Sequence, residues 1–304
     1  MRRNCRGWSY VSDDMRPTRF LVLAVFLVFL SNCSTSLRIP MTVHATHPYV
    51  QVRVNQSEPL WFLLDTGAAA PVNLIDTGRA AAIGLKMVSE RSTGAIGGSA
   101  KVQMTESARL SIGSLDLGAH PLAAMELASN EGEEGHAVHG ILGYAFFSDR
   151  IVTIDYPGRA LVIGGTTRKG SAVPMTIEAK APVIRASLSI GATTENVRLV
   201  VDTGFDDTVI LTRPFVERHA LQRLAESSGT SGKSLGGETT SRVVRARRLR
   251  IGDVDFDDVR VRLSMDRKGA FASGEVDGYV GSGLLQQCAV TFDYPAGRMT
   301  LERR

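Results

Sequence analysis

The chain has few cysteines and few aromatic residues, and both shortages limit what it can be. Its 304 residues include three cysteines, Cys5, Cys33 and Cys288, and 6% aromatic residues. Only Cys288 lies beyond the N-terminal region, so a framework of disulfides within the main domain is excluded. Its surroundings, LLQQCAVTFDY, predict a small buried side chain rather than a reactive thiol.

Charge and histidine patterns exclude further classes of protein. The net charge is +4, and no basic run is interleaved with aromatic residues, so a nucleic-acid partner is not indicated. His136 and His139 are three residues apart, but the polar loop EEGHAVHG supplies no further metal ligand. We therefore expect neither a metal nor a cofactor. His44 and His47 are expected at the surface.

The N-terminus has the pattern of an export signal. Arg16 and Arg19 precede an apolar run, Phe20–Leu30, that is shorter than the roughly 20 residues of a membrane span. Residues 1–33 are thus expected to direct export, with Met15 as a possible start. LSNC resembles a bacterial lipobox, which predicts lipidation of Cys33. Alternatively the signal is simply cleaved, and Cys33 is incidental. Either way we expect an exported bacterial protein, periplasmic or membrane-anchored, whose one membrane contact is such a lipid.

An internal repeat organises the rest of the chain. IPMTVHATHPYVQV parallels VPMTIEAKAPVIRA, and WFLLDTG parallels LVVDTG. AIGGS, RLSIGSLDLG, HGILGYAFF and VTIDYPGR then match SLGGE, RLRIGDVDFD, DGYVGSGLL and VTFDYPAGR in the same order. Six matched segments with small drifts in spacing indicate a duplicated domain, because the period is far too long for a solenoid.

Both copies are predicted to be all-β. Alternating segments such as YVQVRV and RASLSI indicate strands with one buried face. We place one lobe at 39–163, a Gly- and Ser-containing linker at 164–172 and the second lobe at 173–304. The arginines of SRVVRARRLRIG are interpreted as a solvated strand face rather than a binding patch.

Asp-Thr-Gly occurs three times, and the repeat separates the copies. Asp65 aligns with Asp202, and each follows a buried apolar run. Asp76 aligns with Arg213 and precedes an alanine-rich helical segment, so it is predicted to cap that helix. Thr212, followed by Pro214 in the first turn, is expected to take the same role in the second lobe.

Two aspartates at repeat-related positions predict a shared acid–base site. If the lobes pack about a pseudo-two-fold axis, the two carboxyl groups meet and share one proton. The ionised partner can then take a proton from water, and the protonated one can polarise a carbonyl group. The hydroxyls of Thr66 and Thr203 can tie the loops together. Gly67 and Gly204 allow the backbones to approach closely.

These residues resemble the clan of aspartic proteases that includes pepsin and the retroviral proteases. DTGA and DTGF are forms that the clan carries, and ILG and YVG resemble its hydrophobic–hydrophobic–Gly segment. GAIGGSAKVQ and SLGGETT resemble Gly-rich flaps, which implies contacts with substrate from Ile96, Gly97, Gly98, Leu235, Gly236 and Gly237. The resemblance covers residues 40–304. It implies two homologous retropepsin- or pepsin-like lobes about a central cleft, complete in a monomer.

The implied function is aspartic endopeptidase activity on a peptide or protein, with water activated between Asp65 and Asp202. The sequence departs from pepsins at Ala68 and Phe205, which lack the hydroxyl that usually follows Asp-Thr-Gly. The adjoining acidic pair 206–207 is interpreted as facing solvent. One alternative is an exported module that binds peptides or cell-envelope components without cutting them. A purely structural envelope protein is the other.

Overall fold

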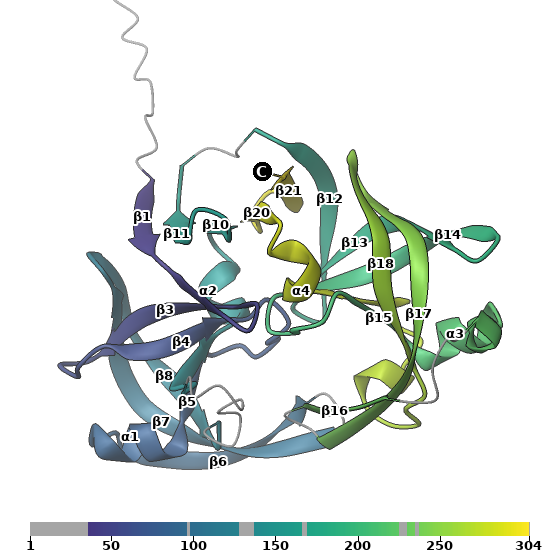
Figure 1. Ribbon diagram of the computed structural model, residues 1–304. Helices are drawn as coiled ribbons and strands as arrows, with labels where there is room; N and C mark the ends of the chain where they lie inside the picture. The colour runs from purple at the N-terminus through teal and green to yellow at the C-terminus, as the bar shows by residue number, and fades with distance from the viewer. Residues whose placement is uncertain are drawn as a thin grey trace, which may run out of the picture. The chain divides into compact units, whose positions relative to one another are not determined.

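The two repeats fold into two β-lobes of the same topology (Figure 1). A computed structural model describes residues 36–95, 98–127, 137–165, 169–224, 230–234 and 237–303. The predicted export signal and Cys33 lie outside these residues. In the part of the chain that is described, no helix has the length and apolar character needed to cross a membrane.

The first lobe contains β1 (Leu37–Pro40), β2 (Thr42–His44), β3 (His47–Val54), β4 (Leu60–Leu64), β5 (Leu74–Asp76), α1 (Thr77–Ala82), β6 (Met87–Ala95), β7 (Gly98–Ile112), β8 (Leu115–Met125), β9 (Gly140–Leu142), α2 (Tyr144–Phe147), β10 (Ile151–Asp155) and β11 (Ala160–Ile163). Its eight-stranded sheet has the order β2-β3-β4-β9-β5-β8-β7-β6.

The second lobe contains β12 (Ser171–Glu178), β13 (Ala181–Ile190), β14 (Thr193–Asp202), β15 (Val209–Leu211), α3 (Arg213–Arg218), the 3-10 helix η2 (Leu221–Leu224), β16 (Thr230–Ser234), β17 (Gly237–Ile251), β18 (Val254–Ser264), the 3-10 helix η3 (Ala270–Ala272), β19 (Gly278–Gly281), α4 (Ser282–Leu285), β20 (Cys288–Asp293) and β21 (Arg298–Arg303). The order β12-β13-β14-β19-β15-β18-β17-β16 repeats that of the first lobe strand for strand.

Side-chain periodicity explains the strands. In β3, Val50, Val52 and Val54 are buried, while Gln51 and Arg53 between them are exposed. This alternation gives one face to the core and one to water. The apolar run of β4 and the last residues of β14 are instead mostly buried on both faces. Alternate residues of β4 pack into two different hydrophobic clusters, Phe62 and Leu64 into one and Leu63 into the other, so both faces are covered.

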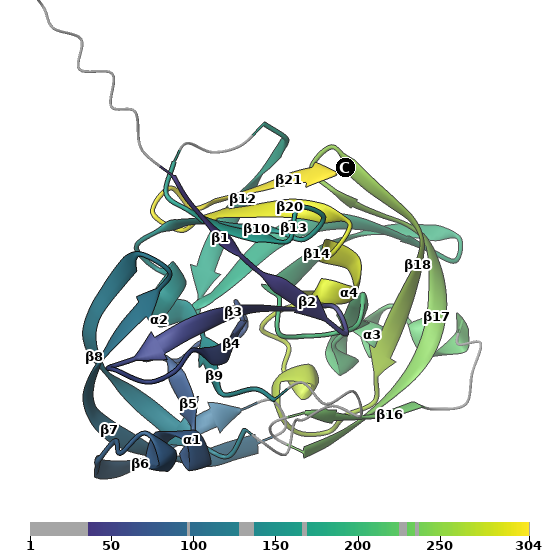
Figure 2. The same ribbon diagram turned by 60° about the vertical axis from the view of Figure 1, so that its left-hand side comes forward.

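The two lobes share a sheet, which the repeat alone did not predict. Strands β1, β11 and β10 of the first lobe continue through β20, β21 and β12 of the second. Figure 2 shows these strands lying together above both lobes. β10 pairs with β20 in antiparallel register, and at its centre Thr153 faces Thr291. Because these threonines are repeat-related, the pseudo-two-fold axis passes between them.

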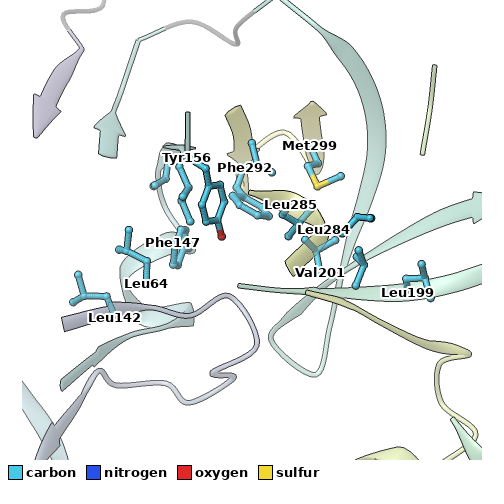
Figure 3. Close-up of a cluster of buried hydrophobic side chains, with 14 of the residues drawn as sticks. Leu64, Leu142, Phe147, Tyr156, Leu199, Val201, Leu284, Leu285, Phe292 and Met299 are labelled. Carbon is cyan, nitrogen blue, oxygen red and sulfur yellow. The ribbon is translucent and has the colours of Figure 1, made fainter. Parts of the chain in front are cut away.

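A common hydrophobic core lies beneath the shared sheet. Figure 3 shows Leu64 and Phe147 from the first lobe near Val201, Leu285 and Phe292 from the second. Phe147 and Phe292 are fully buried, with ring centroids 5.9 Å apart. Burial of large apolar side chains across this boundary stabilises the lobes against each other.

The arginine-rich strand β17 has a solvated face, as the sequence indicated. Arg245 and Arg248 are about half exposed and lie 2.8 and 2.7 Å from the carboxylates of Asp258 and Asp257 on the neighbouring β18. Exposed pairs of this kind contribute little to stability. Their positive charge is largely balanced on the same sheet, so no basic patch is formed by them.

The hydroxyl groups of Thr153 and Thr291 lie 2.8 Å apart and are buried. Thr291→Val should lower the free energy of unfolding by about 1–3 kcal/mol, because it leaves the Thr153 hydroxyl buried without that partner. The double variant Thr153→Val with Thr291→Val should recover most of this loss, since both polar groups are then gone. Urea unfolding of the wild type, both single variants and the double variant measures the coupling; additive losses would contradict a paired contact.

Candidate active site

Two equivalent strands carry Asp65 and Asp202 to the boundary between the lobes. Asp65 follows β4 directly, and Asp202 is the last residue of β14. Each strand runs parallel to a short neighbour, β9 or β19, formed by the ILG and YVG segments. After these segments, Tyr144 and Ser282 donate backbone N–H groups to the carbonyl oxygens of Ala68 and Phe205. Both aspartate loops are therefore held in the same way.

Thr66 and Thr203 join the two loops by reciprocal hydrogen bonds. The N–H of Thr66 donates to the hydroxyl of Thr203 at 3.0 Å, and the N–H of Thr203 donates to the hydroxyl of Thr66 at 3.1 Å. Each hydroxyl in turn donates across the boundary, Thr66 to the carbonyl of Val201 at 2.6 Å and Thr203 to that of Leu64 at 2.7 Å. Both threonines are fully buried, so all these polar groups are paired away from water.

Gly67 and Gly204 are required by the close approach of the two loops. A Cβ on Gly67 would lie 2.4 Å from Cγ of Asp202, and a Cβ on Gly204 would lie 2.4 Å from Cγ of Asp65. Real Cβ atoms do not come this close to another carbon. Each glycine therefore makes room for the carboxyl group of the opposite lobe.

The two carboxyl groups are hydrogen-bonded to each other, which requires a shared proton. Oδ1 of Asp65 accepts from the N–H groups of Gly67 and Ala68 at 2.8 and 3.0 Å. Oδ1 of Asp202 accepts from the N–H of Gly204 at 3.0 Å, and the N–H of Phe205 donates to the backbone carbonyl of Asp202 at 3.3 Å. Burial, and then the charge of Asp65, raise the pKa of Asp202 well above its usual range. Burial also raises the pKa of Asp65, against the lowering effect of its hydrogen bonds.

Asp76, the aspartate of the remaining Asp-Thr-Gly copy, caps a helix, as predicted. Its Oδ1 accepts from the N–H of Arg79 at 3.0 Å at the start of α1, and its Oδ2 accepts from the N–H of Leu127. The prediction for Thr212 was only half correct. Thr212 stands at the N-cap position directly before α3, but its side chain makes no capping bond; its hydroxyl donates to the carbonyl of Val276 at 3.1 Å.

Asp207 and His47 are not the solvent-facing residues that the sequence suggested. The side chain of Asp207 is 14% exposed and lies 2.6 Å from Arg260 on β18. Asp206 is exposed, as expected. His47 is half-buried, and its Nε2 lies 3.1 Å from the carbonyl oxygen of Gly204. Histidine in a polar hairpin resembles a surface residue in sequence, because no local pattern reports a contact with the other lobe.

His139 also has a structural role. Its Nδ1 accepts the N–H of Trp61 at 3.1 Å, and in the second lobe the carboxylate of Asp277 accepts the N–H of Arg198 at 2.9 Å. These repeat-related side chains join β4 to the start of β9 and β14 to the start of β19.

His136 lies outside the described residues. Within the described ranges, no group of three His, Cys, Asp or Glu side chains is placed to hold a metal ion.

The two flap segments are the ends of long β-hairpins. β6 pairs with β7 as far as Ala95 and Gly98, and β16 pairs with β17 as far as Ser234 and Gly237. Gly98 and Gly237 thus stand at equivalent positions at the hairpin ends. The other four flap residues, Ile96, Gly97, Leu235 and Gly236, lie outside the described residues, so contacts of the flaps with a substrate remain a prediction.

Asp202→Asn should stabilise the protein at neutral pH. Because the folded pKa of Asp202 is raised, the folded state keeps a proton that the unfolded chain releases above its ordinary pKa of about 3.9. The contribution of Asp202 to the free energy of unfolding is therefore lost as the pH rises, and the neutral amide of Asn at this position avoids that loss. Thermal unfolding should show a higher midpoint for the variant near pH 7 and no difference near pH 3. The control is the exposed Asp149→Asn, and an equal shift at both pH values would refute the linkage.

Comparisons with known proteins agree with the two-lobed architecture. A family model described as aspartyl protease matches twice, at residues 50–146 and 186–284. Among solved structures, the crystal structure of an aspartic proteinase from Irpex lacteus is 14% identical, with a TM-score of 0.55. The match covers 88% of this chain and 97% of the other, and at this identity it speaks to the fold alone. A search of curated proteins found no match.

Proposed function

Because this chain belongs to the aspartyl protease family, we propose that it is an endopeptidase whose catalytic residues are Asp65 and Asp202. The observation that carries the proposal is the hydrogen bond between their two carboxyl groups, one from each repeat. Two acidic groups so close and so buried stay together only by sharing a proton. The pair thus provides a general acid and a general base at one point, and together these can activate a water molecule for hydrolysis.

The chemistry follows from the shared proton. The ionised carboxylate takes a proton from a water molecule as its oxygen attacks the peptide carbonyl carbon. The neutral carboxyl group donates its proton to the carbonyl oxygen, which forms a neutral tetrahedral adduct. The carboxyl group that took the proton from water then gives it to the nitrogen, and the other carboxylate takes a proton from a hydroxyl group of the adduct as the C–N bond breaks, so the pair again holds one proton. The N–H groups of Gly67, Ala68 and Gly204 hold the carboxyl groups in place throughout.

The substrate would be an extended peptide lying between the aspartates and the two flap hairpins. The hairpin strands β6 and β16 are edge strands of their sheets, so their free backbone groups are suited to strand-like pairing with a peptide. The strands that follow them, β7 and β17, anchor each hairpin in its lobe by pairing with β8 and β18. Both halves of the site belong to one chain, so we propose that the active species is a monomer.

Asp65→Asn and Asp202→Asn should each reduce kcat by roughly two to four orders of magnitude, because either one removes the acid–base pair. The matched control is Asp76→Asn, the same change in the same tripeptide; it should keep kcat and lose only stability. Cleavage of a peptide library by the folded proteins measures the effect. Full activity in either dyad variant would exclude the mechanism. An inactive wild-type protein that still binds peptides would favour the binding module.

We further propose that the enzyme acts in the cell envelope, held by a lipid on Cys33. The proposal rests on the apolar run Phe20–Leu30 and the LSNC sequence. Expressed in a bacterium with labelled palmitate, the wild-type chain should carry label and fractionate with membranes. Cys33→Ala should lose the label, whereas Cys5→Ala should keep it. Labelled Cys33→Ala protein would contradict the assignment.

A further inference from the structure

The hairpin between β2 and β3 of the first lobe contacts the aspartate loop of the second. Its turn has left-handed backbone at Ala45 and Thr46, with φ of 45° and 76°. The hydroxyl of Thr46 lies 3.1 Å from the carbonyl oxygen of Asp206 and 2.8 Å from Oγ of Ser282. The turn is therefore fixed against the loop that follows Asp202, and the next residue of the hairpin, His47, is brought to the same loop.

His47 contacts the residue that binds Asp202. Its Nε2 lies 3.1 Å from the carbonyl oxygen of Gly204. A carbonyl oxygen only accepts, so Nε2 must carry the proton. The N–H of the same glycine donates to Oδ1 of Asp202 at 3.0 Å. His47 therefore holds in place the residue whose N–H binds the carboxyl group of Asp202.

The contact has no counterpart in the other lobe. In the repeat, Lys180 and Ala181 occupy the places of Thr46 and His47, and the β12–β13 turn has the same left-handed backbone at Ala179 and Lys180. A methyl group at 181 cannot donate to the loop of Asp65. The backbone donors differ as well, because the N–H of Ala68 donates to Oδ1 of Asp65 at 3.0 Å, whereas the N–H of Phe205 donates to the backbone carbonyl of Asp202. His47 adds a side-chain difference between the two aspartate loops.

Charge adds to the asymmetry. Hydrogen bonds with Asp202, Gly67 and Ala68 lower the pKa of Asp65 most. The charge of His47 also lowers it, by a smaller amount. The titratable groups placed near His47 are Asp65, Asp206 through Thr46, His44, which is its register partner on β2, and Tyr49, whose ring is 6.3 Å away edge-on. A protonated His47 therefore favours the negative charge of the pair on Asp65.

We propose that His47 is a positioning residue for the aspartate pair: through its contact with the carbonyl oxygen of Gly204, it fixes the loop in which the N–H of Gly204 holds Asp202. This role rests on the proposed function of the pair.

Two variants separate the hydrogen bond from the charge. His47→Ala removes both and should lower kcat about tenfold with little change in KM, because a displaced loop misplaces Asp202. His47→Gln keeps an N–H donor and should recover most of kcat. Neither carries a positive charge, so in both the acid limb of the pH–rate profile should move to higher pH. His120→Ala is the matched control, since its Nε2 lies 2.9 Å from a carbonyl oxygen away from the pair, that of Leu117.

A second measurement does not need turnover. In ¹³C NMR titrations of the full-length chain with labelled aspartate, the lower apparent pKa of the pair should rise in both His47 variants and stay unchanged in His120→Ala. If the wild-type protein cleaves nothing but this shift is seen, the endopeptidase function fails and the role of His47 stands. If both His47 variants keep the wild-type kcat and the wild-type apparent pKa values of the pair, the role of His47 is wrong. A rise in KM alone would also overturn it, because that result would mean that His47 contacts the substrate.

Discussion

The reciprocal hydrogen bonds of Thr66 and Thr203 are the contact on which the site depends. Two acidic side chains repel each other once both ionise, and both lose solvation when buried, so the fold must hold them together against that cost. The threonines do so with backbone and hydroxyl groups alone, which remain neutral at every pH. The shared strands β10 and β20, with Thr153 against Thr291, repeat the same kind of pairing behind the site. The pseudo-two-fold axis is thus fixed at two levels.

Much of the fold and the pair itself could be predicted from the repeat. Residues that recur with the same neighbours must occupy equivalent places, and the sequence alone therefore distinguishes Asp65 from Asp76. The shared sheet was not predictable in this way. Comparing the two copies shows what each lobe is, but says nothing of which strands of one lobe pair with those of the other.

The failures have the same physical origin. His47, Asp207 and Thr212 each sit in a polar segment whose local pattern indicates solvent or a cap. Their partners, Gly204, Arg260 and Val276, are distant in sequence, and two of these contacts use a backbone carbonyl group, which any residue possesses. Such partners leave no trace in residue type or spacing. They become visible only when the chain is folded.

Joining the two lobes in one chain makes the asymmetry at His47 possible. A symmetric dimer of a single lobe would present the same residue to both aspartates, so two histidines would favour ionisation of both and oppose the sharing of a proton. With His47 on one side and Ala181 on the other, the histidine contacts the loop of one aspartate only. The symmetric backbone brings the carboxyl groups together, and the diverged side chains make their surroundings differ.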